Sequence, residues 1–194
     1  MALTESNMLP LGTQAPEFML IDVVDEKIKS LNELKGNNGT IVVFMCNHCP
    51  YVVHLLDEFV ALAKKNIAHG IQTIAISSND VENYPDDHPD KMKQLSIKKE
   101  FSFPYLYDED QSIAKAYEAA CTPDFYLLDG DNTLVYRGRF DASRPGNNST
   151  ITGEDLQLAI DQLLKKEPIP AHQVPSMGCN IKWKAGNEPA GFFI

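Results

Sequence analysis

Residues 40–56, TIVVFMCNHCPYVVHLL, join a strand, two cysteines and the start of a helix. Residues 40–45 are apolar and rich in β-branched side chains, which predicts a buried strand. From Pro50 onward the apolar residues recur at steps of three and four, as they do on one face of a helix. Proline suits the first turn of a helix, because its missing N–H would have no intrahelical partner there. The sequence therefore predicts that Cys49 is the N-cap residue of this helix.

This position matters for the chemistry of the cysteine. The thiolate is the nucleophile in disulfide exchange and in peroxide reduction, and the unpaired N–H groups of a helix N-terminus stabilise that anion. Cys46 stands three positions upstream and can close a disulfide with Cys49 within the same loop. A Cys-x-x-Cys pair at a strand-to-helix junction predicts a redox site, and we favour this interpretation over two structural cysteines.

The composition excludes several classes of function. The chain has 194 residues and a formal net charge of -10 at pH 7. A phosphate-binding surface needs basic clusters, so we expect neither nucleic acid nor a membrane as a partner.

Residues 1–6 contain no signal-peptide pattern, and no stretch approaches the ~20 apolar residues of a membrane-spanning helix. We therefore expect a cytoplasmic protein, in which a Cys-x-x-Cys pair is more often catalytic or metal-binding than a permanent crosslink.

Strands and helices alternate along the rest of the chain. The central helix is expected to end near Ala68, and the polar loop at 78–89 is long enough to suggest a function. Residues 1–15 and 167–194 have no clear period, so we expect a lead-in and a C-terminal tail there. Further elements are predicted from their periodicity and flanking turns, with strands at 71–77, 103–108, 124–129 and 133–138, and helices at 90–100, 111–120 and 153–166.

An N-terminal β-hairpin is predicted before the central strand. Residues 15–22 are expected to form a strand at the sheet edge, where Pro16 costs no ladder hydrogen bond. Residues 28–31 can pair back on this strand, and Ser30 can cap a helical turn at 31–34. The alternation of strands and helices implies parallel pairing with right-handed crossovers, to which the hairpins add antiparallel strands. The predicted fold class is therefore α/β.

Motifs along nearly the whole chain carry a family resemblance. They are Gly12-x-x-Ala15-Pro16-x-Phe18, VVFMCNHCPYV at 42–52, Thr122-Pro123-Asp124-Phe125-x-Leu127-x-Asp129, Tyr136-Arg137-Gly138-Arg139-x-Asp141-x-Ser143-Arg144-Pro145 and Gly178-Cys179-Asn180-Ile181-Lys182-Trp183. In these residues the chain resembles the thioredoxin superfamily, and in particular its peroxiredoxin-like branch (alkyl hydroperoxide reductase/thiol-specific antioxidant, or redoxin) with a Cys-x-x-Cys motif. The resemblance implies a single thioredoxin-like domain over residues 1–194. Its fold would be a three-layer α/β/α thioredoxin fold with an N-terminal β-hairpin extension and a C-terminal tail at 167–194.

The resemblance also implies roles for Thr122 and Pro123. They would form the cis-proline loop of the superfamily, which faces the cysteines and holds a partner chain by backbone hydrogen bonds. A cis peptide bond costs little before proline and turns the chain sharply beside the site. The alternative is an ordinary trans proline that opens a strand.

The register of the two cysteines departs from both branches of the superfamily. Cys49-Pro50 matches the Cys-Pro pair of peroxiredoxins, whereas Cys46 falls where those proteins carry the threonine of their peroxide site. Val52 falls where thioredoxins carry their second cysteine. This departure favours dithiol-disulfide exchange over peroxidase activity, with Cys49 attacking and Cys46 resolving. The two roles are reversed if the helix starts earlier.

The candidates for accessory roles are His48, Cys121, Cys179 and Trp183. A protonated His48 near the thiolate would lower the cysteine pKa further, and an outward, solvated ring is the alternative. Cys121 precedes the cis-proline loop and is either a third redox partner or, as we favour, a small buried hydrophobic residue. Cys179 can resolve an oxidised Cys49 or can serve packing, and Trp183 belongs to the same family motif as Cys179.

We predict a thiol-disulfide oxidoreductase that uses a Cys46/Cys49 dithiol-disulfide cycle and needs no cofactor. Its partners would be a protein or small-molecule disulfide, or peroxide, and a thiol electron donor. One alternative is a thiol peroxidase, an antioxidant enzyme in which Cys49 is the peroxidatic residue. Another is a non-enzymatic redox sensor or metal-binding module. Its zinc ligands would be Cys46, Cys49 and His48 with Cys121 or Cys179. Because only one Cys-x-x-Cys pair is present, we predict no metal site.

Overall fold

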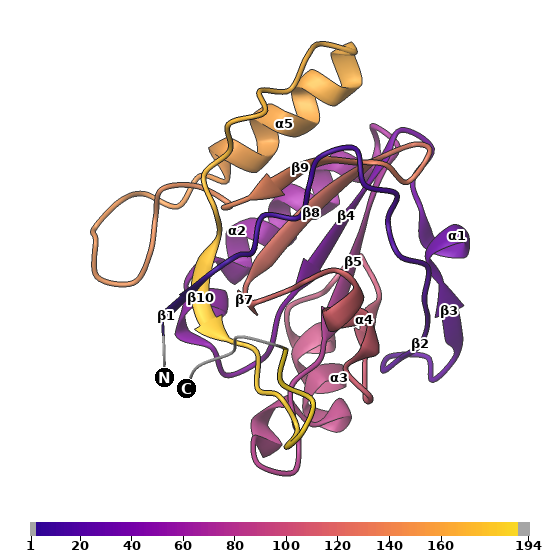
Figure 1. The fold of residues 1–194 in the computed structure, drawn as a ribbon, viewed down its shortest axis with the longest axis vertical. Helices are drawn as coiled ribbons and strands as arrows, with labels where there is room; N and C mark the ends of the chain where they lie inside the picture. The colour runs from indigo at the N-terminus through magenta and orange to yellow at the C-terminus, as the bar shows by residue number, and fades with distance from the viewer. Residues whose placement is uncertain (1–2, 190–194) are drawn as a thin grey trace.

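A seven-stranded mixed sheet forms the centre of the protein, with helices on both of its faces (Figure 1). The computed structural model describes residues 3–189, so residues 1–2 of the predicted lead-in and 190–194 of the predicted tail lie outside it. The strands of the sheet are, in spatial order, β3 (Ile28–Ser30), β2 (Met19–Asp22), β6 (Tyr105–Tyr107), β5 (Ile71–Ser77), β4 (Gly39–Phe44), β8 (Asp124–Asp129) and β9 (Leu134–Gly138). The helices are α1 (Leu31–Leu34), α2 (Pro50–Ile67), the 3₁₀ turn η1 (Pro85–Asp87), α3 (Pro89–Lys98), α4 (Ser112–Ala116) and α5 (Glu154–Lys165).

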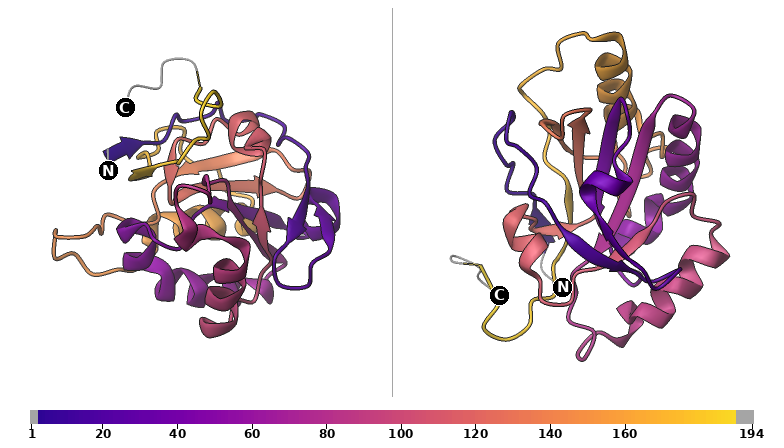
Figure 2. Two further views of the ribbon diagram at one scale, coloured as in Figure 1. Left: turned by 90° about the horizontal axis from the view of Figure 1, so that it is seen from below. Right: turned by 90° about the vertical axis from the view of Figure 1, so that its right-hand side faces the viewer.

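Both faces of the sheet are buried. Side chains of a strand point alternately to opposite faces, and in β4 they enter two different apolar clusters. Ile41 and Val43 pack with residues of α2, α3 and α5, whereas Val42 and Phe44 pack with residues of α1 and α4. The sheet therefore forms the middle of three layers (Figure 2). The α/β class predicted from the sequence and the three-layer arrangement implied by the family resemblance are confirmed.

The junction between β4 and α2 has the form that the sequence predicts. β4 lies between β5, to which it is parallel, and β8, to which it is antiparallel. α2 begins at Pro50 with Cys49 as its N-cap residue. All six residues of β4 are buried, so its carboxyl end is fixed within the sheet. Cys46 and Cys49 consequently start from a rigid position at the end of a central strand.

The N-terminal hairpin is present, but its place in the sheet differs from the prediction. β2 was expected at the edge, whereas it lies between β3 and β6 and pairs antiparallel with both. β3 is therefore the edge strand. Ser30 caps α1 in a capping box with Glu33, as its position before Leu31 predicts. The hairpin extends the sheet because β2 pairs with the edge of β6 that faces away from β5.

A second sheet, of three strands, was not predicted. It contains β1 (Leu3–Glu5), β10 (Met177–Asn180) and β7 (Cys121–Thr122), in that order and all antiparallel. The expected irregular lead-in and tail thus lie side by side as strands (Figure 1). β7 comes directly before Pro123, so this sheet reaches the predicted redox site.

The other elements agree with their predictions in type, while α4 is shorter than the predicted 111–120 helix. Within residues 3–189, no helix combines the length and the apolar character that crossing a bilayer requires.

Candidate active site

Cys49 lies at the N-terminus of α2 and faces the turn between β7 and β8. The peptide bond between Thr122 and Pro123 is cis, as the family resemblance implied. In its thiol form Cys49 donates from Sγ to the carbonyl oxygen of Thr122 over 3.1 Å. The Sγ of Cys46 lies 3.5 Å from Oγ1 of Thr122, within hydrogen-bonding distance. The structure thus brings both cysteines of the Cys-x-x-Cys motif to the cis-proline turn.

The pKa values of the Cys49 and Cys46 thiols are shifted in opposite directions. Hydrogen bonding from the Cys46 thiol is the largest influence that lowers the pKa of Cys49, from 9.0 to about 4. Burial opposes this shift, while the Cys179 thiol, the Thr122 hydroxyl and the Val52 N–H support it. The same hydrogen bond, together with burial and the charge of Asp87, raises the pKa of Cys46 well above its ordinary value. Near neutral pH the site therefore holds a Cys49 thiolate and a Cys46 thiol.

The predicted source of this acidity accounts for part of it. The sequence suggested that the free amides of the helix N-terminus would stabilise the thiolate, and the N–H of Val52, in the first turn of α2, does lower the pKa of Cys49. The Cys46 and Cys179 thiols lower it more than this amide does. Hydrogen bonds from neighbouring thiols stabilise a sulfur anion in the same way as amides do, because they are strengthened by its charge.

The other two cysteines also lie near the turn. Cys179 of β10 is paired with Thr122 and hydrogen-bonds to Cys49. Cys121 is completely buried and donates from Sγ to the carbonyl oxygen of Pro123 over 3.6 Å. Burial raises the pKa of Cys121 well above its ordinary value, so this thiol stays protonated. Trp183, the remaining accessory candidate, is half-buried and packs on the cluster that contains Phe44, across the sheet from α2.

His48 is held by a buried carboxylate. Its Nδ1 donates to Oδ2 of Asp87 over 2.7 Å, and Asp87 has no exposed surface. The other oxygen of Asp87, Oδ1, accepts the backbone N–H groups of Asn47 and His48 over 2.8 Å and 3.3 Å. The His48 ring stacks on Tyr84 with 5.6 Å between ring centroids. The ring is therefore directed to Asp87, and its predicted effect on the acidity of Cys49 stays a prediction.

Asp87 was not singled out in the sequence. It lies in the polar loop at 78–89, which was recognised as a candidate functional loop, but the loop contains several acidic residues and periodicity does not distinguish them. Asn79 of the same loop donates to Asp87 Oδ2 over 2.7 Å and accepts the Lys182 N–H over 2.9 Å. Asp87 thus joins the Cys-x-x-Cys loop to the segment that follows β10.

Replacing Asp87 by asparagine is expected to lower the free energy of unfolding by about 1–3 kcal/mol, because an amide NH₂ would face buried donors that the carboxylate now satisfies. Urea denaturation of the reduced protein measures this change. Asp86→Asn is the matched control, since Asp86 is exposed and pairs with Lys91 at the surface; it should cost less than about 1 kcal/mol. Equal losses in both variants would contradict the structural role of Asp87.

One group of possible metal ligands is found within residues 3–189. One ligand atom from each of Cys46, His48 and Asp87 lies within 4.8 Å of the others. This set differs from the predicted alternative, because it contains Asp87 in place of Cys49 and a further cysteine. His48 Nδ1 and Asp87 Oδ2 are already hydrogen-bonded to each other. A cation at this place would have to compete with that hydrogen bond.

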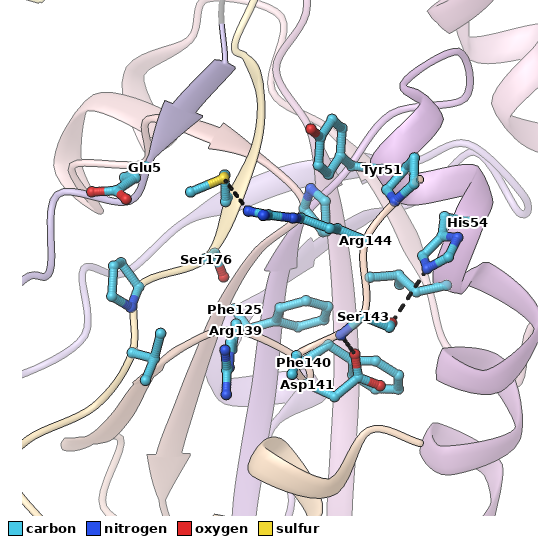
Figure 3. Close-up of a pocket in the computed structure, with 17 residues that line it drawn as sticks. Glu5, Tyr51, His54, Phe125, Arg139, Phe140, Asp141, Ser143, Arg144 and Ser176 are labelled. Atoms are coloured by element: carbon cyan, nitrogen blue, oxygen red, sulfur yellow. Dashed lines mark hydrogen bonds between the residues drawn. The ribbon is translucent and has the colours of Figure 1, made fainter. Parts of the chain in front are cut away.

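A pocket of about 190 Å³ opens beside the cis-proline (Figure 3). Pro123 lines it together with Phe125 and Phe140, whose rings stack with 5.7 Å between centroids. Tyr51 of α2 and Arg144 of the loop after β9 lie at the same pocket. The pocket offers an apolar surface with charged groups of both signs, next to the turn that contacts both cysteines; the charged lining residues are Glu5, Arg139, Asp141 and Arg144.

Residues 11–137 match the model of the AhpC/TSA family. No curated protein sequence matches the chain. An uncharacterized conserved protein from Geobacillus kaustophilus is 50% identical, with a TM-score of 0.93 over 95% of this chain and 97% of that chain. A hypothetical protein from Sinorhizobium meliloti 1021 is 43% identical, with a TM-score of 0.92 over 94% of this chain and 100% of that chain.

A more distant similarity concerns the fold alone. A thiol:disulfide interchange protein of the thioredoxin family from Chlorobium tepidum TLS is 17% identical, with a TM-score of 0.61 over 79% of this chain and 97% of that chain. The chain thus has a thioredoxin-like fold. The Cys-x-x-Cys loop and the cis-proline turn of this chain lie within it.

Proposed function

Because the chain belongs to the AhpC/TSA family, a family with a thiol-based redox role, we propose that it is a thiol-disulfide oxidoreductase with a Cys46/Cys49 dithiol-disulfide cycle. The Cys49 thiolate attacks one sulfur of a substrate disulfide, and the other sulfur leaves as a thiolate. Cys46 then loses its proton and attacks Cys49 Sγ, which releases the second half of the substrate. The chain is left with a Cys46–Cys49 disulfide, and an external thiol donor reduces it again.

The meeting of both cysteine sulfurs at Thr122 is the observation that carries this proposal, with Cys46 Sγ 3.5 Å from its hydroxyl and Cys49 Sγ 3.1 Å from its carbonyl oxygen. This arrangement keeps the resolving sulfur near the sulfur that it must attack, and the lowered pKa of Cys49 supplies the thiolate that starts the reaction. Thr122 contacts both sulfurs and fixes the pair against the cis-proline turn. A thiolate of low pKa also stabilises the reduced state, which makes the disulfide form a better oxidant.

The burial of the site favours small substrates. Cys49 has no exposed surface and Cys46 is 1% exposed. Neither cysteine lines the pocket beside Pro123, so a disulfide reaches Cys49 only when the surrounding chain moves, and a small disulfide requires less movement than a folded protein.

Peroxide reduction is the second candidate function. The family match supports it, and so does the burial of an acidic Cys49, because hydrogen peroxide is smaller than any disulfide. In this reaction Cys49 would be oxidised to a sulfenic acid with release of water, and Cys46 would condense with it to a disulfide. Both reactions end in the same Cys46–Cys49 pair, so the product alone does not distinguish them.

Rates distinguish the two functions. Reduced protein is mixed in separate experiments with glutathione disulfide and with hydrogen peroxide, and the second-order rate constant of Cys49 oxidation is measured by mass spectrometry after blocking free thiols. Faster reaction with the disulfide supports the proposal, and faster reaction with peroxide supports the second candidate. Stoichiometric bound metal by elemental analysis, with no turnover on either oxidant, would contradict both and support a non-enzymatic module.

A further inference from the structure

A third thiol reaches Cys49 from a distant part of the chain. Cys179 of β10 lies directly opposite Thr122 of β7 in an antiparallel pair. Side chains opposite each other in such a pair project to the same face of the sheet. The Thr122 hydroxyl lies beside Cys46, so Cys179 is on the face that carries the dithiol. Cys179 and Cys49 lie in the same buried cluster, and Cys49 Sγ is 3.1 Å from the carbonyl oxygen of Thr122, the residue opposite Cys179. The Cys179 thiol also lowers the pKa of Cys49.

Cys121 provides an internal comparison. It is the neighbour of Thr122 on β7 and, because side chains alternate along a strand, it points to the opposite face. Its Sγ is directed to the carbonyl oxygen of Pro123. Cys121 and Cys179 are both buried and both lie at the cis-proline turn. The two thiols therefore differ mainly in the face of the sheet to which they project: Cys179 projects to the face that carries the dithiol and Cys121 to the other.

β10 is held closely against this turn. A Cβ atom on Gly178 would lie 2.0 Å from the carbonyl oxygen of Thr122, so only glycine allows the two backbones to approach as they do. On its other edge β10 pairs with β1, and Ser176 and Ser6 extend this pairing through hydrogen bonds of 2.9 Å and 3.0 Å. Cys179 is consequently a fixed part of the site.

We propose that Cys179 is a second disulfide partner of Cys49, so that the site is a three-thiol relay. The relay rests on the proposed function, in which Cys49 attacks. The Cys49 thiolate breaks the S–S bond of a small disulfide, binds one half and releases the other half as a thiolate. Cys179 loses its proton to solvent, attacks Cys49 Sγ and expels the second half as a thiolate. The substrate has then gained two electrons, and the chain contains a Cys49–Cys179 disulfide.

Charge explains why Cys179 acts in the second step. While Cys49 is a thiolate, burial and that anion raise the pKa of Cys179 to about 12, and Cys179 remains a protonated donor. When Cys49 enters a mixed disulfide, its negative charge is lost and with it the influence on Cys179. The neighbouring cation Lys182 already acts to lower the pKa of Cys179. Formation of the mixed disulfide at Cys49 therefore makes Cys179 more nucleophilic.

The test removes Cys46 and counts the released thiolates. Reduced Cys46→Ser protein receives one equivalent of the aromatic disulfide dithiobis(nitrobenzoate). Attack by Cys49 releases one coloured nitrothiobenzoate, and attack by Cys179 on the mixed disulfide releases a second. We expect two thiolates per reagent molecule, no nitrothiobenzoate adduct by mass spectrometry, and a Cys49–Cys179 crosslinked peptide.

Two double variants complete the test. Cys46→Ser/Cys179→Ser should release one thiolate and retain the adduct on Cys49, whereas the matched control Cys46→Ser/Cys121→Ser should release two. An adduct that persists on Cys49 in Cys46→Ser overturns the relay while leaving Cys49 as the attacking residue. Release of two thiolates without Cys179 also overturns it. An adduct on a cysteine other than Cys49 overturns the assignment of Cys49 and hence the proposed function.

Discussion

Cys49→Ser is expected to reduce the rate of disulfide cleavage by about a thousand-fold or more. A serine hydroxyl at this position would be protonated near neutral pH, whereas the hydrogen bonds from the Cys46 and Cys179 thiols hold the Cys49 thiol as an anion. The measurement is the second-order rate constant with which reduced protein releases nitrothiobenzoate from dithiobis(nitrobenzoate). No external reductant is needed, so the rate reports the attack of the protein thiol directly.

Two further variants show whether this loss is specific. Cys46→Ser retains the attacking sulfur and should still release the first thiolate, because the serine hydroxyl can donate to the Cys49 thiolate in place of the Cys46 thiol. Cys121→Ser should react within a few-fold of the wild-type rate, since serine can donate to the Pro123 carbonyl as the Cys121 thiol does. If Cys49→Ser cleaves the reagent at the wild-type rate, another thiol attacks and the assignment of the nucleophile is wrong.

Strong local patterns made the centre of the fold predictable. β4 is a run of buried β-branched residues, and α2 has an apolar face with Pro50 in its first turn, so the strand, the helix and the N-cap position of Cys49 follow from local rules. The AhpC/TSA family match and the three-layer architecture agree with the family resemblance of the sequence. The cis peptide before Pro123 was implied by that resemblance, because an X-Pro sequence by itself permits either isomer.

Local sequence patterns do not predict the second sheet. β10 contains Gly178, which weakens a strand by propensity, and β1 has only three residues. These strands form because the chain ends meet beside β7, and such a contact has no sequence period. The N-terminal hairpin was assigned to the wrong edge for a similar reason. Its pairing partner β6 is distant in sequence and short.

The acidity of Cys49 was predictable from the sequence, but only one of the groups that cause it, the helix amides, was predicted. The sequence predicts an acidic Cys49, and it assigns the effect to helix amides. The larger contributors are the Cys46 and Cys179 thiols, one of which arrives from a strand that was not predicted. Asp87 illustrates the same limit, since its role depends on donors from Asn47, His48 and Asn79 that meet only in the folded chain.

The reduced protein is expected to keep one thiolate down to about pH 4, where an ordinary cysteine would be protonated below about pH 8.5. The ultraviolet absorbance of the thiolate measures this directly as the pH is lowered from mildly alkaline to strongly acidic. The low-pH step should be absent in Cys49→Ser and present in Cys121→Ser. A step near pH 8.5 in the wild-type protein would contradict the hydrogen-bonded thiolate.

The same shift has a consequence for stability. The folded state releases the Cys49 proton at a lower pH than the unfolded state, so between these two pKa values the unfolded chain binds more protons. The stabilisation that the Cys49 thiolate gives to the reduced protein is therefore complete above about pH 8.5 and is lost as the pH falls toward about 4. Urea denaturation of the reduced wild type against Cys49→Ser should show a difference that grows with pH across this range.

Cys46→Ala identifies the group responsible. If the Cys46 thiol is the main donor, the variant should titrate at a distinctly higher pH than the wild type, because alanine has no group that can donate a hydrogen bond to the Cys49 thiolate. If the amides of α2 were the main source, the low-pH step would stay near pH 4 in the variant. The pH of the low-pH step in the Cys46 variant therefore distinguishes the two explanations. The contacts of Cys49 favour the Cys46 thiol as the main donor.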